Sequence, residues 1–143
     1  MITDEYIAGF FDGEGCITSQ MIFQTGKYEK YPRVNVQLSI ANTNRQTLED
    51  ISQKYGGSIS KKGNRPQTVR ECYSLCITGK ENMSIFLNAI LPYLRIKKDQ
   101  AIIALEFIET IREENLGCVA LNPEIHLIRK NIHDKLRLLK RVA

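Results

Sequence analysis

Hydrophobic and polar positions alternate with a period of two in several parts of the chain. The clearest case is residues 33–42, where every second residue is apolar and the residues between are polar. This period indicates a strand with one buried face. The same kind of pattern, bounded by turn residues, predicts four strands: residues 16–24, 33–42, 58–62 and 69–77. A short turn would join the two members of each pair.

Apolar residues at helical spacing predict the remaining elements. Thr3 is placed to cap a helix whose first turn holds two acids, and Asn122-Pro123 is a typical cap and first turn. The predicted helices are residues 3–13, 43–55, 79–91, 97–114 and 122–141. The order is therefore αββαββα followed by C-terminal helices. This is an α+β fold, in which a curved antiparallel four-stranded sheet carries helices on one face.

The chain has the length of one domain. Its 143 residues are expected to form a single unit over residues 1–143, with a core of about 3–115 and a C-terminal helix of about 122–141. No run approaches the ~20 apolar residues of a membrane helix, and the N-terminus lacks a signal pattern. We expect an intracellular protein without a membrane partner. Four cysteines lack zinc-site spacing and are expected to be reduced: Cys16, Cys72, Cys76 and Cys118.

Charge is unevenly distributed along the chain. Residues 1–15 hold four acids and no Lys or Arg, so they sum to −4, whereas the rest of the chain sums to +8 and the net charge is +4. This asymmetry suits a protein that binds a polyanion with most of its surface and a metal ion at one point. Charge alone is equally consistent with solvated residues scattered over a surface.

The polar side of the strand predicted at residues 33–42 is almost uncharged. Its members are Arg33, Asn35, Gln37 and Ser39. Arg pairs with guanine, and Asn or Gln with adenine, in the DNA major groove. This face is a candidate for base contacts, with a plain solvated face as the alternative. The next predicted hairpin adds four basic residues and no acid within residues 61–70, and is a candidate for phosphate contacts: Lys61, Lys62, Arg65 and Arg70.

Residues 7–15 contain the candidate chemistry. Gly9 and Gly13 are four residues apart, so they share one helix face and allow another backbone to approach. Glu14 follows the predicted helix between two glycines, which permit backbone conformations that other residues resist. A carboxylate at a helix C-terminus is unfavourable, so an acid there favours a bound cation such as Mg²⁺. From these residues alone, a surface acid in a turn is the simpler interpretation. The large apolar residues are expected to face the core: Ile7, Phe10 and Phe11.

The segment Ile7-Ala8-Gly9-Phe10-Phe11-Asp12-Gly13-Glu14-Gly15 resembles the LAGLIDADG signature of homing endonucleases. Two more segments are similar to that family: Ile40-Ala41-Asn42-Thr43-Asn44 resembles its strand-to-helix junction, and Leu94-Arg95-Ile96-Lys97-Lys98-Asp99-Gln100-Ala101 resembles its lysine-bearing segment before a long helix. The resemblance covers about residues 5–112. It implies a single-motif, homodimeric enzyme that makes metal-dependent double-strand breaks in a long pseudo-palindromic DNA target and leaves short 3′ overhangs.

The resemblance also implies roles for individual residues. Glu14 would bind Mg²⁺ or Mn²⁺ together with the backbone carbonyl of Gly13. Asn44 would order waters near the scissile phosphate, and Lys97 would stabilise charge or tune the attacking water. The dimer interface would hold Ile7, Ala8, Gly9, Phe10, Asp12 and Gly13. Strand alternation assigns the DNA-facing set, which a one-residue slip would exchange for its neighbours: Thr18, Gln20, Gln24, Arg33, Asn35, Gln37, Ser39, Lys62, Arg70 and Ser74.

Other interpretations stay open. A LAGLIDADG-derived protein can bind without cutting, as a splicing maturase on intron RNA or as a DNA-binding regulator, although the presence of Glu14 and Lys97 favours the nuclease. A helix-rich scaffold with a fortuitous motif is disfavoured by the polar strand faces. From residues alone, Lys97 is more simply a solvated lysine at a helix start. His126 and His133 form no metal or general-base constellation and are expected at the surface or in packing. No small-molecule substrate is expected.

Overall fold

The computed structural model describes residues 1–23, 33–63, 70–111 and 123–142. The elements in chain order are α1 (Asp4–Glu14), β1 (Gly15–Ile22), β2 (Arg33–Asn42), α2 (Arg45–Tyr55), β3 (Ser58–Lys61), β4 (Tyr73–Ile77), α3 (Lys80–Ile90), the 3₁₀ turn η2 (Leu91–Tyr93), α4 (Lys98–Glu109) and α5 (Pro123–Val142). The expectations for Gln24, Arg65, Cys118 and Asn122 fall outside these described residues.

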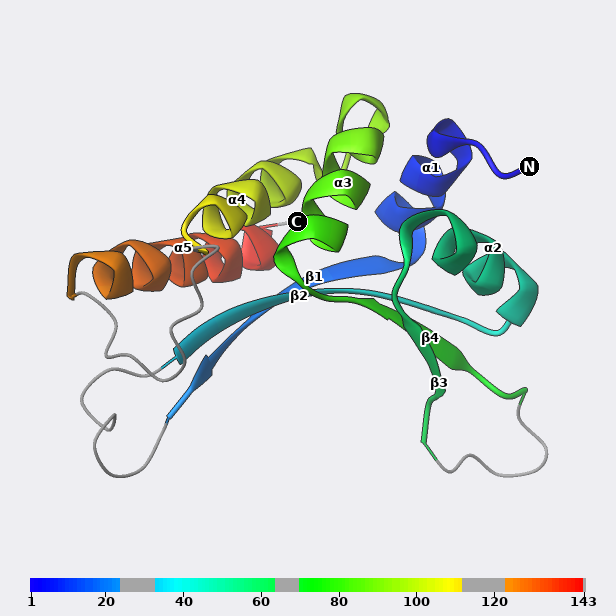
Figure 1. Cartoon of the computed structure of the whole chain (residues 1–143), viewed down its shortest axis with the longest axis horizontal. Helices are drawn as coiled ribbons and strands as arrows, with labels where there is room; N and C mark the ends of the chain where they lie inside the picture. Colours follow the sequence, from blue (N-terminus) through cyan, green and yellow to red (C-terminus); the bar gives the residue numbers. More distant parts are fainter. Residues whose placement is uncertain (24–32, 64–69, 112–122, 143) are drawn as a thin grey trace.

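The four strands form one antiparallel sheet in the order β1-β2-β4-β3. Figure 1 shows the sheet as an arch, with the helices stacked on its convex side and none of the described helices under its concave side. The predicted α+β class, element order and curved four-stranded sheet are therefore confirmed. None of the helices described by the structure is long and apolar enough to cross a membrane.

Several predicted boundaries are wrong by a few residues. Helix α1 includes Glu14, which was expected just beyond it, and α2 begins only after Asn44, whose side chain caps it. Strand β4 begins at Tyr73 rather than at residue 69. Helix α4 ends at Glu109 instead of residue 114, because Thr110 folds back and donates both its backbone N–H, at 2.9 Å, and its hydroxyl, at 2.6 Å, to the Phe107 carbonyl.

The core lies between the sheet and the helical layer. Helix α1 contributes Ile7, Ala8 and Phe11, all with 0% exposure. The Phe11 ring packs edge-on against Phe86 of α3, with 5.6 Å between the ring centroids. Phe10 is partly buried and packs against the core as expected, and its ring also stacks on Tyr6 with 6.1 Å between the ring centroids. The buried stripe of α1 therefore runs through Ala8, because Ala8 and Phe11 share one helix face.

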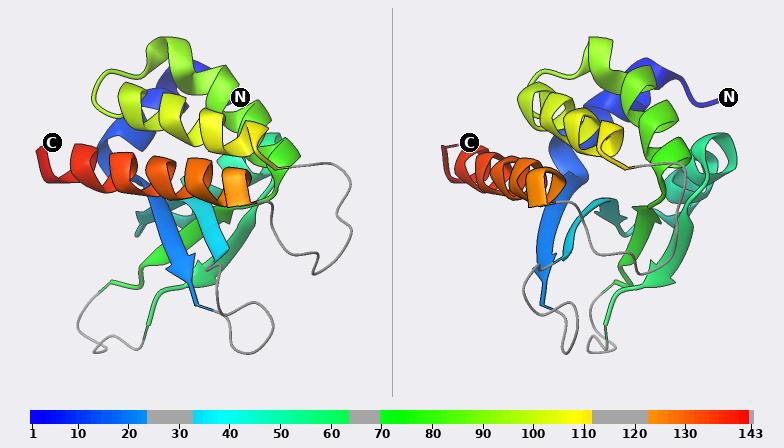
Figure 2. Two further views of the ribbon diagram at one scale, coloured as in Figure 1. Left: turned by 90° about the vertical axis from the view of Figure 1, so that its left-hand side faces the viewer. Right: turned by 60° about the vertical axis from the view of Figure 1, so that its left-hand side comes forward.

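Helix α5 lies beside α4 and against β1, as Figures 1 and 2 both show. Arg129 binds the end of α4: its Nε donates to the Thr110 hydroxyl at 3.0 Å and its Nη2 to the Thr110 carbonyl at 2.9 Å. His133 is buried and its Nδ1 lies 2.7 Å from the Ser19 hydroxyl on β1. The last helix therefore packs on the body, and His133 is one of its packing residues, which is one of the two expectations for it.

Gly15 joins α1 to β1 in a crowded place. Its φ is −82°, so it does not need the freedom of glycine for its backbone conformation, and Gly13 is ordinary helix. The expectation that these two glycines adopt unusual conformations is wrong. Gly15 is needed for space instead, because an added Cβ would lie 2.3 Å from Cδ2 of the Phe11 ring.

We expect Gly15→Ala to destabilise the fold by about 1–3 kcal/mol, since the Phe11 ring that a methyl group would meet is fixed against Phe86. The free energy of unfolding in urea measures this. Ser60→Ala, an exposed change on β3, is the control and should stay within about 0.5 kcal/mol of the wild type. Equal stability of the Gly15→Ala variant and the wild type would contradict the close approach.

Candidate active site

Glu14 is the last residue of α1 and its side chain is exposed. The last turn of the helix contains no basic residue of its own, so the negative end of the helix dipole and the carboxylate lie together. Within the described residues, Glu14 takes part in no salt bridge. An exposed, uncompensated carboxylate in this position is suited to binding a cation.

Lys97 reaches this helix end from far along the chain. It is the residue just before α4, and its Nζ donates to the backbone carbonyl of Asp12 at 2.5 Å. The Asp12 carboxylate in turn accepts from the backbone N–H of Arg95 at 2.8 Å and of Lys97 at 3.0 Å. The structure thus brings Lys97 to the α1 terminus that carries Glu14, as the resemblance implied.

A second lysine approaches the same corner from α5. The Nζ of Lys140 lies 3.4 Å from the sulfur of Cys16, two residues after Glu14, and the Cys16 sulfur is 3.3 Å from the Thr18 hydroxyl. Burial raises the pKa of the Cys16 thiol, but the Thr18 hydroxyl and the ammonium groups of Lys140 and Lys97 outweigh it and lower the pKa overall. Sequence reasoning missed Lys140 as a site residue, and the only signal was the basic surplus of the last helix.

Strand register determines which side chains face the open side of the sheet. Cys16 pairs with Ser39 and Ser39 with Cys76, while Thr18 pairs with Gln37. Their neighbours in sequence are core residues such as Ile17 and Leu38, at 0% exposure, so a one-residue slip is excluded. The open face holds these members of the predicted set: Thr18, Gln20, Arg33, Asn35, Gln37, Ser39 and Ser74. Sequence reasoning missed others on the same face: Cys16, Ser58, Ser60 and Cys76.

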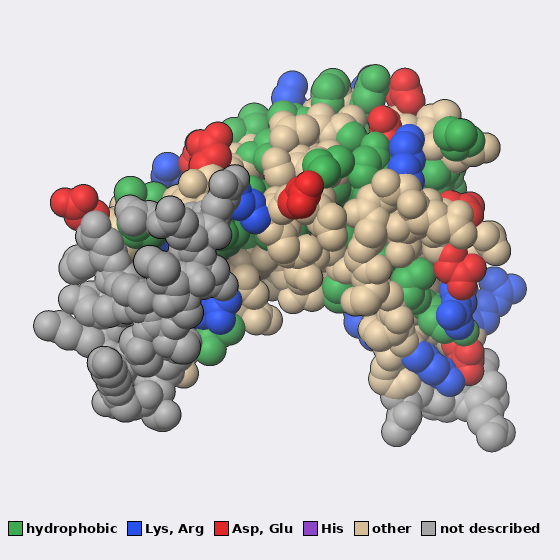
Figure 3. Space-filling model, in the orientation of Figure 1, with side chains coloured by type: hydrophobic (Ala, Val, Ile, Leu, Met, Phe, Trp, Pro, Cys, Tyr) green, Lys and Arg blue, Asp and Glu red, His purple; other side chains and the backbone are tan. Residues whose placement is uncertain are grey.

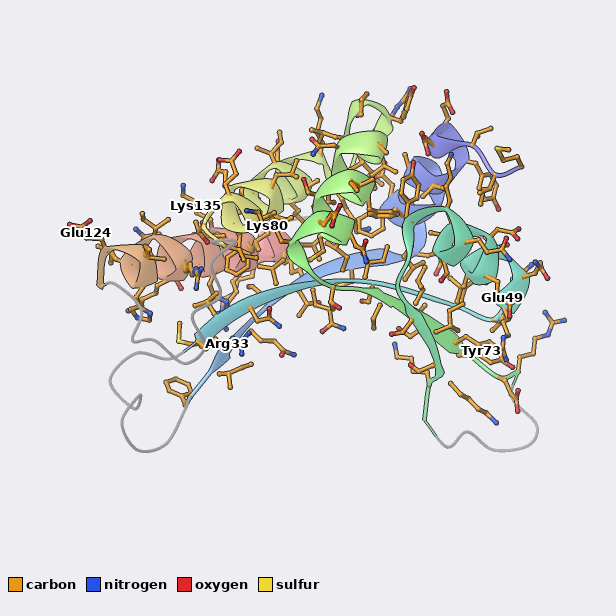
Figure 4. The ribbon with its side chains drawn as sticks, viewed as in Figure 1. Arg33, Glu49, Tyr73, Lys80, Glu124 and Lys135 are labelled. Carbon is orange, nitrogen blue, oxygen red and sulfur yellow. The ribbon has the colours of Figure 1, made fainter. Side chains whose placement is uncertain are left out.

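The open face is polar and almost free of acids. Figure 3 shows the hollow beneath the arch lined mainly by side chains that are neither apolar nor acidic. In Figure 4 these side chains extend from the strands into the hollow, with Arg33 at the start of β2, whereas Tyr73 of β4 packs on the helix side of the sheet. Gln37 is held in place there by a hydrogen bond from its Nε2 to the Cys76 sulfur at 3.1 Å.

Comparison with known proteins places this arrangement in a family. A model described as LAGLIDADG endonuclease matches residues 7–108. The chain belongs to the LAGLIDADG endonuclease family. It is 29% identical over 135 residues to the DNA endonuclease I-CvuI of Chlorella vulgaris. The aligned region covers 94% of this chain and 77% of I-CvuI.

Solved structures of LAGLIDADG proteins have the same fold. One of them is I-CvuI in complex with a DNA target in the presence of 2 mM Mg, with the DNA not cleaved. It matches this chain with a TM-score of 0.74 at 26% identity, over 95% of this chain and 80% of I-CvuI. The archaeal intron-encoded homing endonuclease I-Vdi141I, complexed with DNA, matches with a TM-score of 0.77 at 23% identity, covering 95% and 82%. The second likeness concerns the fold alone.

Asn44, a site residue inferred from the resemblance, has a structural role in the fold. The Asn44 side chain accepts from the backbone N–H of Thr47 at 3.2 Å and so caps α2. The Asn44 backbone N–H donates to the Asn42 side chain at 2.8 Å. In the described part of the chain no hydrogen bond joins Asn44 to Glu14 or Lys97. Its water-ordering role stays a prediction, whereas its capping role accounts for its position.

The two lysines of the β3–β4 hairpin face opposite sides. Lys61 is ion-paired with Glu71 at 2.6 Å, and Glu71 also accepts from the Tyr73 hydroxyl at 2.7 Å. The Lys61 ammonium lowers the pKa of the Glu71 carboxyl. Lys62 is exposed one residue beyond β3, where its backbone N–H still pairs with the Cys72 carbonyl at 2.8 Å, so alternation places its side chain on the open face with Ser60. Lys61 thus lies on the face opposite to Lys62, and its contact with phosphates stays a prediction. Arg70 is exposed.

The α1 face predicted to form a dimer needs correction. Ile7 and Ala8 are fully buried within the single chain, and the Asp12 carboxylate binds the backbone before α4, so none of these three is free for a partner. Gly9 and Gly13 are exposed, and an added Cβ at either would meet nothing within 4 Å. The α1 surface that is open to a second backbone therefore runs through the two glycines, beside the partly buried Phe10 and the exposed Tyr6.

The residues at the site are compatible with the binding of a hard divalent cation such as Mg²⁺. Among the described residues, no group of three or more His, Cys, Asp or Glu converges to hold an ion. Mg²⁺ is commonly held by only one or two carboxylates together with waters and substrate phosphate oxygens. The exposed carboxylate of Glu14 is a ligand of this type.

Proposed function

We propose that this protein is a homing endonuclease that cuts both strands of a specific double-stranded DNA target as a homodimer, using Mg²⁺ or Mn²⁺. One observation carries the proposal: Glu14 ends α1 with its carboxylate exposed and in no salt bridge among the described residues, and the Lys97 ammonium binds the Asp12 carbonyl in the last turn of the same helix. An enzyme of this kind works in the compartment that holds its target DNA, so we place it inside the cell.

In the proposed reaction each chain contributes its own residues to the cutting of one strand. Glu14 and the Gly13 carbonyl would hold the divalent ion, which when bound supplies a more acidic water and stabilises charge on the phosphate. The Lys97 ammonium is fixed within 2.5 Å of the Asp12 carbonyl, where it adds positive charge next to the carboxylate. Lys140 adds another cation through its contact with Cys16, and we propose that it contacts a nearby phosphate.

The sheet is proposed to lie in the major groove. A concave face of Asn, Gln, Ser and Thr side chains offers donors and acceptors to base edges. The curvature of the arch suits a cylindrical partner (Figure 1). Arg33, Lys62 and Arg70 are exposed basic residues that would contact the DNA backbone. I-CvuI was solved in complex with a DNA target, which supports this assignment.

The homodimer is proposed because one chain holds one motif and one such carboxylate. The exposed α1 face has Gly9 and Gly13 four residues apart, which permits close helix packing. Large apolar residues are exposed on α1 and on the segment after α3 that contacts it: Tyr6 at 54%, Tyr93 at 45% and Ile96 at 67%. Pairing of two α1 helices would cover Tyr6 and bring the two Glu14 carboxylates together.

Glu14→Gln should abolish cleavage, with a rate loss of more than about 100-fold, because a neutral amide is a poor ligand for a divalent ion. Cleaved targets are first recovered from a plasmid library incubated with protein and Mg²⁺. Single-turnover rates on a recovered target then compare the variants, while Ca²⁺ is used to measure DNA affinity, which should be unchanged.

Glu81→Gln, an exposed acid at the start of α3, is the control and should cut like the wild type. Wild-type cleavage by Glu14→Gln would remove Glu14 from the site. Specific binding by the wild-type protein without any Mg²⁺-dependent or Mn²⁺-dependent cleavage would instead identify a non-cutting LAGLIDADG binding protein.

Lys62→Ala should weaken binding to all DNA sequences and reduce the slope of log K against log salt concentration by about one, as expected for one lost phosphate contact. Lys61→Ala is the matched control: its ammonium is occupied by Glu71 on the other face, and loss of an exposed ion pair changes little. Titrations at several salt concentrations measure both. Equal losses of DNA affinity in the two variants would show that the face on which a hairpin lysine lies does not determine whether it contacts DNA.

Gly9→Ala should separate folding from dimerisation. Within one chain the new methyl group meets nothing and gains up to about 1 kcal/mol of helix propensity, yet it would keep two α1 helices apart. We expect a shift toward monomer in sedimentation velocity, together with slower cleavage at low protein concentration. Gln53→Ala, on the exposed surface of α2, should remain dimeric. An intact, fully active Gly9→Ala dimer would place the interface elsewhere.

A further inference from the structure

We propose that Asp12 is a positioning residue: its carboxylate fixes the backbone of residues 95–97 and thereby orients the Lys97 ammonium toward the reacting phosphate. The inference rests on the proposed function in one respect, the catalytic role of Lys97. Asp12 is the sixth residue of the motif. The proposal gives it a role in positioning Lys97 within one chain, and no role in the contact between chains.

Asp12 accepts hydrogen bonds with both carboxylate oxygens and with its backbone carbonyl. One carboxylate oxygen accepts the Arg95 N–H at 2.8 Å and the other accepts the Lys97 N–H at 3.0 Å. The Asp12 carbonyl accepts the Lys97 side chain at 2.5 Å. Asp12 lies in the last turn of α1, where carbonyls have no helical partner. Asp12 therefore holds both the backbone and the ammonium of Lys97.

Local sequence provides no substitute for these contacts. Helix α4 has no side-chain cap, because Lys97 occupies its N-cap position and cannot accept a hydrogen bond. Helix α1 has no basic residue in its last turn. Each helix therefore caps the other: the Asp12 carboxylate lies at the positive start of α4 and the Lys97 ammonium at the negative end of α1.

The segment that Asp12 holds is otherwise poorly anchored. Leu94 is buried at 4% exposure, but Arg95 is exposed and Ile96 is 67% exposed. Two backbone hydrogen bonds to Asp12 hold Arg95 and Lys97 in the turn between the buried Leu94 and the first turn of α4. A small displacement of this turn would move the Lys97 ammonium, and displacements of about 1 Å can cost two orders of magnitude in rate.

Asp12→Asn tests the proposal, because an amide nitrogen cannot accept the second backbone N–H. We expect the single-turnover cleavage rate in Mg²⁺ to fall by roughly 10-fold to 100-fold, while DNA affinity in Ca²⁺ and the dimer in sedimentation velocity stay unchanged. Asp99→Asn is the control: it removes an exposed acid from the first turn of the same helix without touching residues 95–97, and should cut like the wild type.

A double-mutant cycle distinguishes positioning of Lys97 from a general loss of structure. If Asp12 acts through Lys97, Asp12→Asn should lower the rate little further in a Lys97→Ala background, so the two losses are not additive. Additive losses overturn the proposal, as does a wild-type rate for Asp12→Asn. A monomeric Asp12→Asn protein also overturns it, because that result assigns Asp12 to the interface.

Amide hydrogen exchange gives a readout that does not depend on cleavage. The Arg95 and Lys97 amides should be protected in the wild-type dimer and exchange faster in Asp12→Asn, and unchanged protection overturns the proposal. A wild-type protein that cuts no DNA would end the proposed function, yet this exchange would still decide whether Asp12 holds Lys97. If Asp12→Asn does not fold, Asp12→Glu replaces it, because its longer side chain displaces both acceptor oxygens. Slower cleavage by Asp12→Glu at unchanged DNA affinity supports the proposal, and a wild-type cleavage rate overturns it.

Discussion

The mutual capping of α1 and α4 is the interaction on which the site depends. Asp12 accepts the backbone N–H groups that precede α4, and Lys97 donates to the last turn of α1. Helix ends leave backbone groups unpaired and carry partial charge, so two ends of opposite sign stabilise each other when they meet. Because Glu14 is the last residue of α1, the same contact that joins the helices also brings the lysine to the helix end that carries the acid.

The sheet provides the second constraint. Burial of alternate residues on β1 and β2 against the helices leaves no freedom of register, since a one-residue slip would move residues such as Ile17 and Leu38 into solvent. The open face is then determined in full, and its polar side chains follow from the pairing. The hairpin β3–β4 extends this face while directing Lys61 into an ion pair on the other side.

The family and the geometry agree on the kind of site that one chain can supply. One chain supplies one exposed carboxylate at a helix end, a lysine fixed beside it and a concave polar face. Phosphodiester hydrolysis on both strands needs two such sets, and a helix face with two unobstructed glycines is well suited to pairing them. Helix α5, which lies beyond the residues that the family model matches, adds Lys140 near the same corner.

The sequence by itself determined the element order, the α+β class and the open face of the sheet, because period-two and helical patterns are local consequences of burial. It also identified Glu14 and Lys97 through the motif. It could not determine that Asp12 faces inward, that Asn44 caps α2, or that Ala8 is buried while Gly9 is open. The Asn44 cap is local, but the contacts of Asp12 join residues as many as 85 positions apart. Only the docking of residues 95–97 against the end of α1 decides which polar groups Asp12 meets.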